Sequence, residues 1–180
     1  PENIPNDEIL KNNLGKPLTS IPDPFGKFES FAEHNNTMLK QFLKKFNFEF
    51  SFKSSTENYK NGIFNESLKR VAEKYDGIMN IILPTLRSER RKTYSPFLPL
   101  CPDTGKVLEI PMISLDKNTG GIIFDNNGKK IQTSIYDGNC KLQWKVDWAM
   151  RWFTFDVDFE MYGKDLTESA ILSSNVCKIL

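Results

Sequence analysis

Apolar residues recur at helical spacing in several stretches of the chain, and this pattern predicts its main helices. One helix is expected to begin at Ser30, which forms a capping box with Glu33, and to continue to Phe46. A second should begin near Asn65 or Ser67, either of which could cap it, and should kink or end at Pro84. A short helix is also expected near residues 7–13.

Strict alternation of apolar and polar residues predicts strands in two other places. Residues 48–52 read FEFSF, and residues 157–161 read VDFEM. The second segment runs into Gly163 and then into another helix-like stretch. Helices that alternate with strands indicate an α/β fold, in which ligands bind at the carboxyl ends of the strands.

The stretch from Tyr94 to Trp144 has a different pattern. Short apolar segments at 106–112, 121–124 and 130–135 are separated by Gly-containing turns, and Asn-Gly between such segments predicts a hairpin. We therefore expect an antiparallel β-rich insertion at 94–144, flanked by 1–93 and 145–180, which belong to one α/β domain.

Composition narrows the class of protein. With 180 residues, of which 39% are hydrophobic, the chain can form a substantial core, and its net charge of +1 does not by itself indicate nucleic-acid binding. Three cysteines do not form a paired disulfide framework, which favours the cytoplasm. No run of 18 apolar residues and no signal peptide is present. The chain begins at Pro1 without Met, so we interpret it as an internal fragment.

Candidate chemistry concentrates in residues 141–165. Trp148 and Trp152 share a helical face, and Asp147 and Arg151 have the same spacing. Trp rings attract cations, but two Trp at this spacing are also typical of a hydrophobic core. Both interpretations stay open at this stage.

Other candidate sites are weaker. Arg87, Arg90, Arg91 and Lys92 form a basic cluster that fits either a solvated helix C-terminus or a phosphate contact. Walker A and GxGxxG motifs are absent, and a single His disfavours a catalytic triad. A structural zinc site needs four ligands, usually Cys or His, and the insertion offers only Cys101 and Cys140, so we expect no structural zinc.

Several segments together resemble one family, the class I lysyl-tRNA synthetases, and its bacterial branch in particular. They are GKPLTSIPDPFG (15–26), ESFAEHNN (29–36), IILPTLRSERRKTYSPFLP (81–99), KLQWKVDWAMRW (141–152) and VDFEMYGKDL (157–166). They follow the family's order, and the resemblance extends over essentially the whole chain.

The resemblance implies a Rossmann-like catalytic domain with a connective insertion. It implies an enzyme that uses ATP, with Mg²⁺, to form lysyl-adenylate and then transfers lysine to tRNA(Lys); no membrane and no protein partner is implied. The HIGH and KMSKS motifs are absent from the chain, so the catalytic residues are unknown and the isolated fragment is expected to be inactive. GKDL at 163–166 replaces the GKDH of many members, and Thr104 stands where zinc-ribbon relatives have a second Cys after Cys101.

On this basis Asp147, Trp148 and Trp152 are candidates for the lysine pocket. Gly163, Lys164 and Asp165 are candidates for ATP binding, although Asp165 also fits a helix cap. Arg87, Arg90 and Arg91 are weaker candidates for tRNA phosphates. Two alternatives stay open: a non-catalytic tRNA-binding module, and a related class I synthetase for another amino acid such as glutamate, for which Arg151 would be a candidate.

Overall fold

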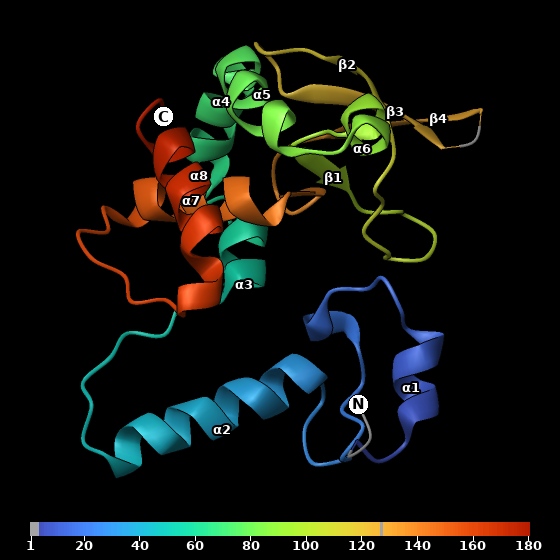
Figure 1. Ribbon diagram of the computed structural model, residues 1–180. Helices are drawn as coiled ribbons and strands as arrows, with labels where there is room; N and C mark the ends of the chain where they lie inside the picture. Colours follow the sequence, from blue (N-terminus) through green and yellow to red (C-terminus); the bar gives the residue numbers. More distant parts are fainter. Residues whose placement is uncertain (1–3, 127) are drawn as a thin grey trace. The chain divides into compact units, whose positions relative to one another are not determined.

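The computed structural model describes residues 4–126 and 128–180, which divide into two compact units. The first comprises the chain up to Thr56 together with Cys101–Leu108, and the second comprises Glu57–Leu100 and Glu109–Leu180. Helices and antiparallel sheets occur together, which confirms the expected mixed α/β class (Figure 1).

The first unit contains helices α1 (Asp7–Asn12) and α2 (Phe31–Lys45), both of which were predicted. Ser30 caps α2, because its Oγ accepts a 3.1 Å hydrogen bond from the Glu33 N–H. The Glu33 side chain in turn accepts from the N–H of Glu29, one residue earlier than in a standard capping box.

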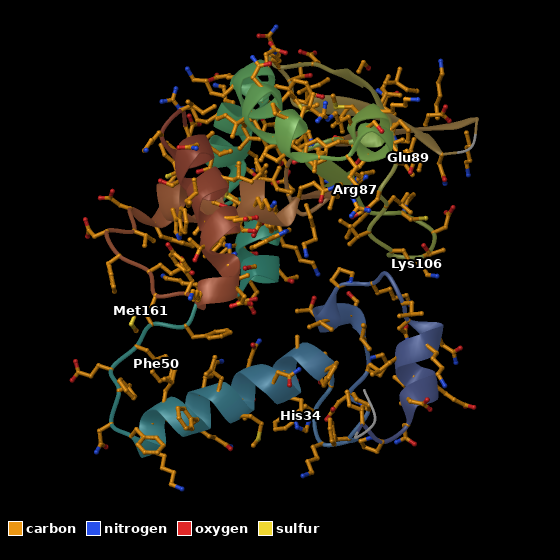
Figure 2. All side chains as sticks on the ribbon, viewed as in Figure 1. His34, Phe50, Arg87, Glu89, Lys106 and Met161 are labelled. Atoms are coloured by element: carbon orange, nitrogen blue, oxygen red, sulfur yellow. The ribbon has the colours of Figure 1, made fainter. Side chains whose placement is uncertain are left out.

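Asp23 organises the turn before α2. Its carboxylate accepts hydrogen bonds from the N–H groups of Phe25, Lys27 and Phe28, and it lies 2.9 Å from Nδ1 of His34, which is labelled in Figure 2. Although its loss of hydration raises the pKa of Asp23, these bonds, led by that of His34, lower it to about 2.

Cys101–Leu108 forms a turn in this unit. The N–H of Gly105 donates to the Cys101 carbonyl and the N–H of Cys101 to the Lys106 carbonyl, each at 2.8 Å. The N–H of Val107 donates to the Gly15 carbonyl, which attaches the turn to the N-terminal segment.

Most of the helices lie in the second unit. The long run predicted from residue 65 forms two helices, because Lys74 departs from helical geometry, and Pro84 lies in a 3-10 turn after the second. Neither Asn65 nor Ser67 is a cap: the N-cap is Phe64, while Asn65 binds Asp137 and Ser67 binds Thr154. Helix α3 (Ser55–Lys60) begins in the last two residues of the first unit's main segment and continues into the second unit. The other helices of the second unit are α4 (Asn65–Glu73), α5 (Tyr75–Ile82), α6 (Ser88–Thr93), α7 (Trp144–Phe155) and α8 (Thr167–Cys177).

Two antiparallel sheets accompany these helices. In one, β1 (Phe97–Pro99) pairs with β5 (Cys140–Leu142). In the other, β3 (Gly121–Asn126) lies between β2 (Met112–Leu115) and β4 (Lys129–Ser134). The predicted hairpin is confirmed by the pairing of Asn126 with Lys129, although Asn127 of its turn lies outside the described residues. The strand expected at 106–112 instead begins at Met112.

The core of the second unit lies where α4, α5, α7 and α8 pack against the sheet residues. α7 and α8 lie side by side in Figure 1. The largest completely buried side chains are apolar and come from all of these elements: Phe64, Phe97, Phe124, Leu68, Ile78, Ile82, Ile122, Ile135, Met150, Val71, Val146 and Val176.

Two predicted strands are wrong. Residues 48–52 and 157–161 contain no strand, and their apolar side chains are exposed: Phe48 is 59% exposed, Phe159 80% and Met161 85%. Phe50 and Met161 mark the two segments in Figure 2. A strand needs a neighbour for its N–H and C=O groups, and no described residue pairs with either segment. The strand pairs in the described residues are all antiparallel.

Candidate functional site

Three tryptophans form a continuous row along α7. Trp144 stacks on Trp148 with ring centroids 5.5 Å apart and planes at 21°, and Trp148 contacts Trp152 at 4.9 Å. The spacing of four residues places all three on one face of the helix. Trp148 is buried, with 5% of its surface exposed, whereas Trp144 is 49% exposed.

Glu160 connects Trp148 and Trp152. Its Oε1 accepts a 2.9 Å hydrogen bond from the Trp148 indole N–H, and its Oε2 accepts from the Trp152 indole N–H. The segment that carries Glu160 turns back along α7 because Asp156 ends the helix in the left-handed conformation, with φ of 50°. The candidate tryptophans are therefore fixed by an acid that the sequence analysis did not select.

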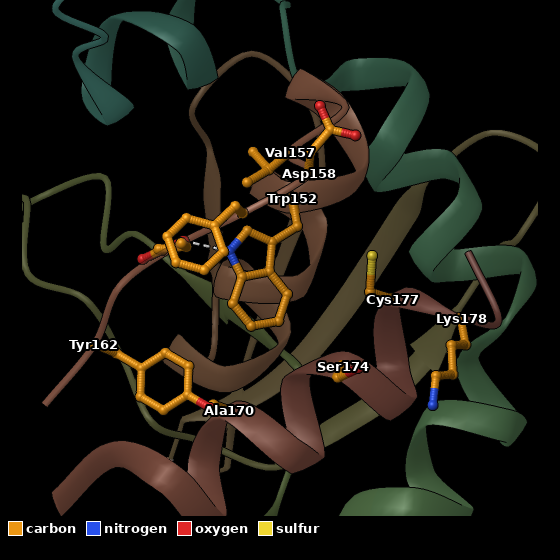
Figure 3. Close-up of a pocket in the computed structure, with 10 residues that line it drawn as sticks. Trp152, Val157, Asp158, Tyr162, Ala170, Ser174, Cys177 and Lys178 are labelled. Carbon is orange, nitrogen blue, oxygen red and sulfur yellow. Dashed lines mark hydrogen bonds between the residues drawn. The ribbon is translucent and has the colours of Figure 1, made fainter. Parts of the chain in front are cut away.

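A cavity of about 480 Å³ opens beside this acid (Figure 3). Its walls come from the end of α7, the segment after it and one face of α8. It contains aromatic, apolar and charged groups of both signs. The lining residues are Trp152, Val157, Asp158, Phe159, Glu160, Tyr162, Ala170, Ser174, Cys177 and Lys178. Of the residues predicted for a lysine pocket, Trp152 lines this cavity, whereas Asp147 and Trp148 do not.

Asp147 has partners elsewhere. The Tyr59 hydroxyl donates a 2.5 Å hydrogen bond to Asp147 Oδ1, and Arg151 Nε lies 2.9 Å from Oδ2. Burial, together with the negative charge of Asp147, raises the pKa of Tyr59 well above its ordinary value, so Tyr59 stays a donor. Asp147 and Arg151, whose spacing places them on one helical face, form an ion pair, and both contacts keep Asp147 bound within the protein.

Gly163, Lys164 and Asp165 follow directly after Tyr162, a lining residue of the cavity. Lys164–Leu166 form a 3-10 turn, and α8 begins after Leu166, so Asp165 is not the N-cap of α8. A Cβ placed on Gly163 would lie 2.5 Å from Asp165 Oδ1, so the glycine makes room for this carboxylate. Gly163, Lys164 and Asp165 are all exposed to solvent.

The basic cluster is divided among different contacts. Arg91 donates to the carbonyls of Leu86 and Pro84 at 2.7 and 3.2 Å, which satisfies the end of the preceding 3-10 turn. Arg90 pairs with Glu109 at 3.1 Å. Arg87, labelled in Figure 2, precedes α6 and is exposed. The cluster is therefore not a set of equivalent free cations.

Sequence reasoning missed Glu160, Tyr162 and the α8 residues of the cavity. Glu160 is one of the polar residues that alternate with apolar ones at 157–161, where a strand is expected, and no sequence pattern distinguishes Ser174 or Lys178. A signal for Glu160 did exist, since it is an acid eight residues after Trp152 that directly follows Phe159. A tryptophan indole that becomes buried requires an acceptor, and Glu160 supplies it.

Among the residues that the structure describes, no three His, Cys, Asp or Glu side chains are grouped as metal ligands. All three cysteines are free thiols. None of the described helices has the length and apolar character needed to cross a membrane.

Comparison with known proteins identifies the family. A family model described as tRNA synthetases class I (K) matches residues 1–180. The lysine–tRNA ligases of Rickettsia bellii (strain OSU 85-389), Rickettsia felis and Rickettsia typhi are 53%, 51% and 49% identical to the chain. Each alignment covers 100% of this chain but 35%, 34% and 34% of the relative, so the chain spans about a third of their length. The chain belongs to the class I tRNA synthetases of the lysine type.

Proposed function

We propose that this chain is part of a lysine–tRNA ligase that acts in the cytoplasm on lysine, ATP and tRNA(Lys). The lysine carboxylate attacks the α-phosphorus of ATP, pyrophosphate leaves, and lysyl-adenylate forms. The acyl group then passes to the terminal adenosine of the tRNA and AMP is released. Mg²⁺ accompanies ATP and balances its phosphate charge. We keep the α/β domain at 1–93 and 145–180 and the insertion at 94–144 as part of this proposal.

The observation that carries the proposal is the position of Glu160 in the wall of the cavity of about 480 Å³. A lysine side chain needs an apolar surface for its four-carbon stem and an anion for its ammonium group. Trp152 and Tyr162 supply aromatic surface, and Glu160 supplies the anion. A carboxylate oxygen has two lone pairs, so each oxygen of Glu160 retains one acceptor site beside its indole bond.

This arrangement refines the set of predicted lysine residues. Trp152 is proposed to contact the substrate directly. Trp148 is proposed to act through Glu160, which it orients by its indole N–H. Asp147 is proposed to hold α7 in place through Tyr59 and Arg151 rather than to receive the ammonium.

The ATP half of the site is proposed at Gly163, Lys164 and Asp165. The attacking carboxylate must reach the α-phosphorus of ATP, so the two substrates must bind next to each other. These three residues follow Tyr162, which lines the cavity. Lys164 can approach phosphate oxygens, and Asp165 can accept hydrogen bonds from ribose hydroxyls.

Lysine-dependent exchange of pyrophosphate into ATP by the full-length protein tests the proposal. Glu160→Gln should raise the KM for lysine at least about tenfold, since the neutral amide binds an ammonium more weakly than the carboxylate does. Asp158→Asn is the matched control, because it removes another acid of the same cavity. Equal lysine KM values for wild-type and Glu160→Gln enzymes would contradict the assignment.

The same assay separates the alternatives. Exchange that depends on glutamate instead of lysine would identify a related synthetase, with Lys178 as the cavity's cation. Salt-dependent tRNA binding without any exchange would favour a non-catalytic module. The isolated chain of 180 residues is expected to form no lysyl-tRNA when it is tested separately in an aminoacylation assay, because it lacks the HIGH and KMSKS motifs.

A further inference from the structure

The cavity beside Glu160 contains groups that attract arginine as well as lysine. The Glu160 carboxylate pairs with a guanidinium at least as well as with an ammonium group. Trp152 and Tyr162 add aromatic surface, on which a guanidinium stacks readily. Attraction alone therefore does not select lysine from arginine, and selection requires a group that repels the longer cation.

Helix α8 gives this cavity a direction. Ala170, Ser174 and Cys177 line it at spacings of four and three residues, so one face of the helix runs along the cavity. Figure 3 shows these residues in order, with Tyr162 at the Ala170 end and Lys178 at the opposite end. The helix has 11 residues, so its two ends are about 15 Å apart.

A lysine substrate occupies only part of this length. Its carboxylate must meet ATP, whose proposed site at 163–165 follows Tyr162 and precedes α8. The bonds from the carboxyl carbon of lysine to its ammonium nitrogen are about 1.5 Å long and about six in number, so lysine spans at most about 9 Å. With its ammonium group at Glu160, lysine therefore stops short of the Lys178 end of the cavity.

Lys178 supplies the positive charge at that end. Among the described residues that line the cavity it is the cation, it is exposed, and no ion pair between described residues includes it. It follows the last residue of α8, where the helix dipole favours a cation, and its ammonium group has no carboxylate partner there. The guanidinium of arginine lies further along its side chain than the ammonium group of lysine, so it extends past Glu160 toward this charge.

We infer that Lys178 is a specificity-determining residue, which repels the guanidinium of arginine and leaves the shorter lysine bound at Glu160. The inference rests on the proposed function, because it takes this cavity as the lysine site. Like unit charges about 4 Å apart in water repel enough to weaken binding about fivefold. Because Lys178 is exposed, the effect should decrease as salt is added.

Competition in the full-length protein tests the inference. Arginine and ornithine, a cation shorter than lysine, are added as inhibitors of lysine-dependent exchange of pyrophosphate into ATP. Lys178→Met removes the charge and keeps a long side chain, so it should lower the inhibition constant of arginine at least about threefold at low salt. The inhibition constant of ornithine and the KM for lysine should change by less than about twofold, because neither cation extends past Glu160.

Two further variants separate charge from structure. Lys74→Met is the matched control, since Lys74 is also an exposed lysine that follows the last residue of a helix, and it does not line the cavity. It should leave the inhibition by arginine as in wild type. Lys178→Arg retains the charge and should also reject arginine as wild type does. The difference between wild type and Lys178→Met should decrease at high salt, which the loss of a packing contact would not produce.

The outcomes distinguish this inference from the proposed function. Normal lysine-dependent exchange with an unchanged inhibition constant for arginine in Lys178→Met overturns the inference alone. An equal fall in the inhibition constants of arginine and ornithine also overturns it, because the effect would then not depend on length. Arginine that inhibits without competing with lysine leads to the same conclusion. A full-length wild type without lysine-dependent exchange overturns the proposed function, and this inference with it.

Discussion

Tyr59 and Asp147 are 88 positions apart in the chain, and a 2.5 Å hydrogen bond joins them. The Tyr59 oxygen also accepts a 3.2 Å hydrogen bond from the N–H of Leu142. One buried hydroxyl thus connects α3, β5 and the first turns of α7. This bond explains why Asp147 is held within the protein and why the tryptophan row on α7 has a defined position.

Tyr59→Phe should therefore destabilise the second unit. The change leaves Asp147 Oδ1 without the Tyr59 donor and the Leu142 N–H without an acceptor, at a cost of about 1–3 kcal/mol. Urea unfolding followed by circular dichroism measures the difference. Tyr162→Phe, which alters a residue that is 46% exposed, is the control and should change stability by less than about 0.5 kcal/mol. Similar stabilities for the two variants would show that the Tyr59 bonds contribute little.

Asp23 should make the stability of the first unit depend on acid. Its pKa is lowered to about 2 in the folded state, below the ordinary value of about 3.9, so its contribution is present above pH 4 and is lost as the pH falls through about 2. Urea unfolding at a series of pH values between 5 and 2 measures this loss. Asp23→Asn should be less stable at pH 5 and show a shallower pH dependence, whereas Asp103→Asn in the exposed turn should behave as wild type.

Gly120→Ala should destabilise the β2–β3 turn strongly. Gly120 has φ of 73°, and a Cβ there would lie 2.4 Å from a ring carbon of Tyr136, so the change adds both backbone strain and a clash. We expect a loss of at least about 1–3 kcal/mol in urea unfolding. The neighbouring Gly121→Ala is the matched control, because its φ is not positive and its nearest contact is 3.3 Å from Thr119 Oγ1. A smaller loss for Gly120→Ala than for Gly121→Ala would contradict this account.

Trp152→Phe in the full-length enzyme should raise the KM for lysine with little loss of stability. Trp152 lines the cavity beside Glu160 and is partly exposed, so its substitution removes substrate contact more than core packing. Trp148→Phe should instead lower the melting temperature, because Trp148 is buried. Steady-state kinetics and thermal unfolding of both variants measure these effects. If both lower the melting temperature and leave KM unaltered, Trp152 is a core residue.

Asp165→Asn should weaken ATP binding about tenfold, which corresponds to about 1.4 kcal/mol, and leave the KM for lysine nearly unaltered. A charged acceptor makes a stronger hydrogen bond to a ribose hydroxyl than an amide oxygen does. The melting temperature should not change, since Asp165 is exposed and does not cap α8. ATP dependence is measured in the pyrophosphate exchange assay. Wild-type ATP dependence in the variant would remove Asp165 from the proposed ATP site.

Local patterns in the sequence determined the helices and the hairpin. The Ser30 cap, the helical spacing of the apolar residues in α2 and α4–α5, and the turn signal between β3 and β4 all depend on residues close together in the chain. Their energetics are local, because caps and turns satisfy backbone groups within a few residues. The ion pair between Asp147 and Arg151 is also a local interaction, because the two residues are four positions apart on one helix.

Tertiary structure decided which patterns became strands and which side chains met. Alternation at 48–52 and 157–161 is real, but a strand forms only where another segment supplies hydrogen-bond partners, and the described residues supply none. Likewise, the sequence marked Trp148 and Trp152 but not Glu160, whose role depends on how the chain turns back after Asp156. Spacing along a helix shows which residues share a face; the acid that faces them comes from a separate segment, and its position depends on the path of the backbone between the two.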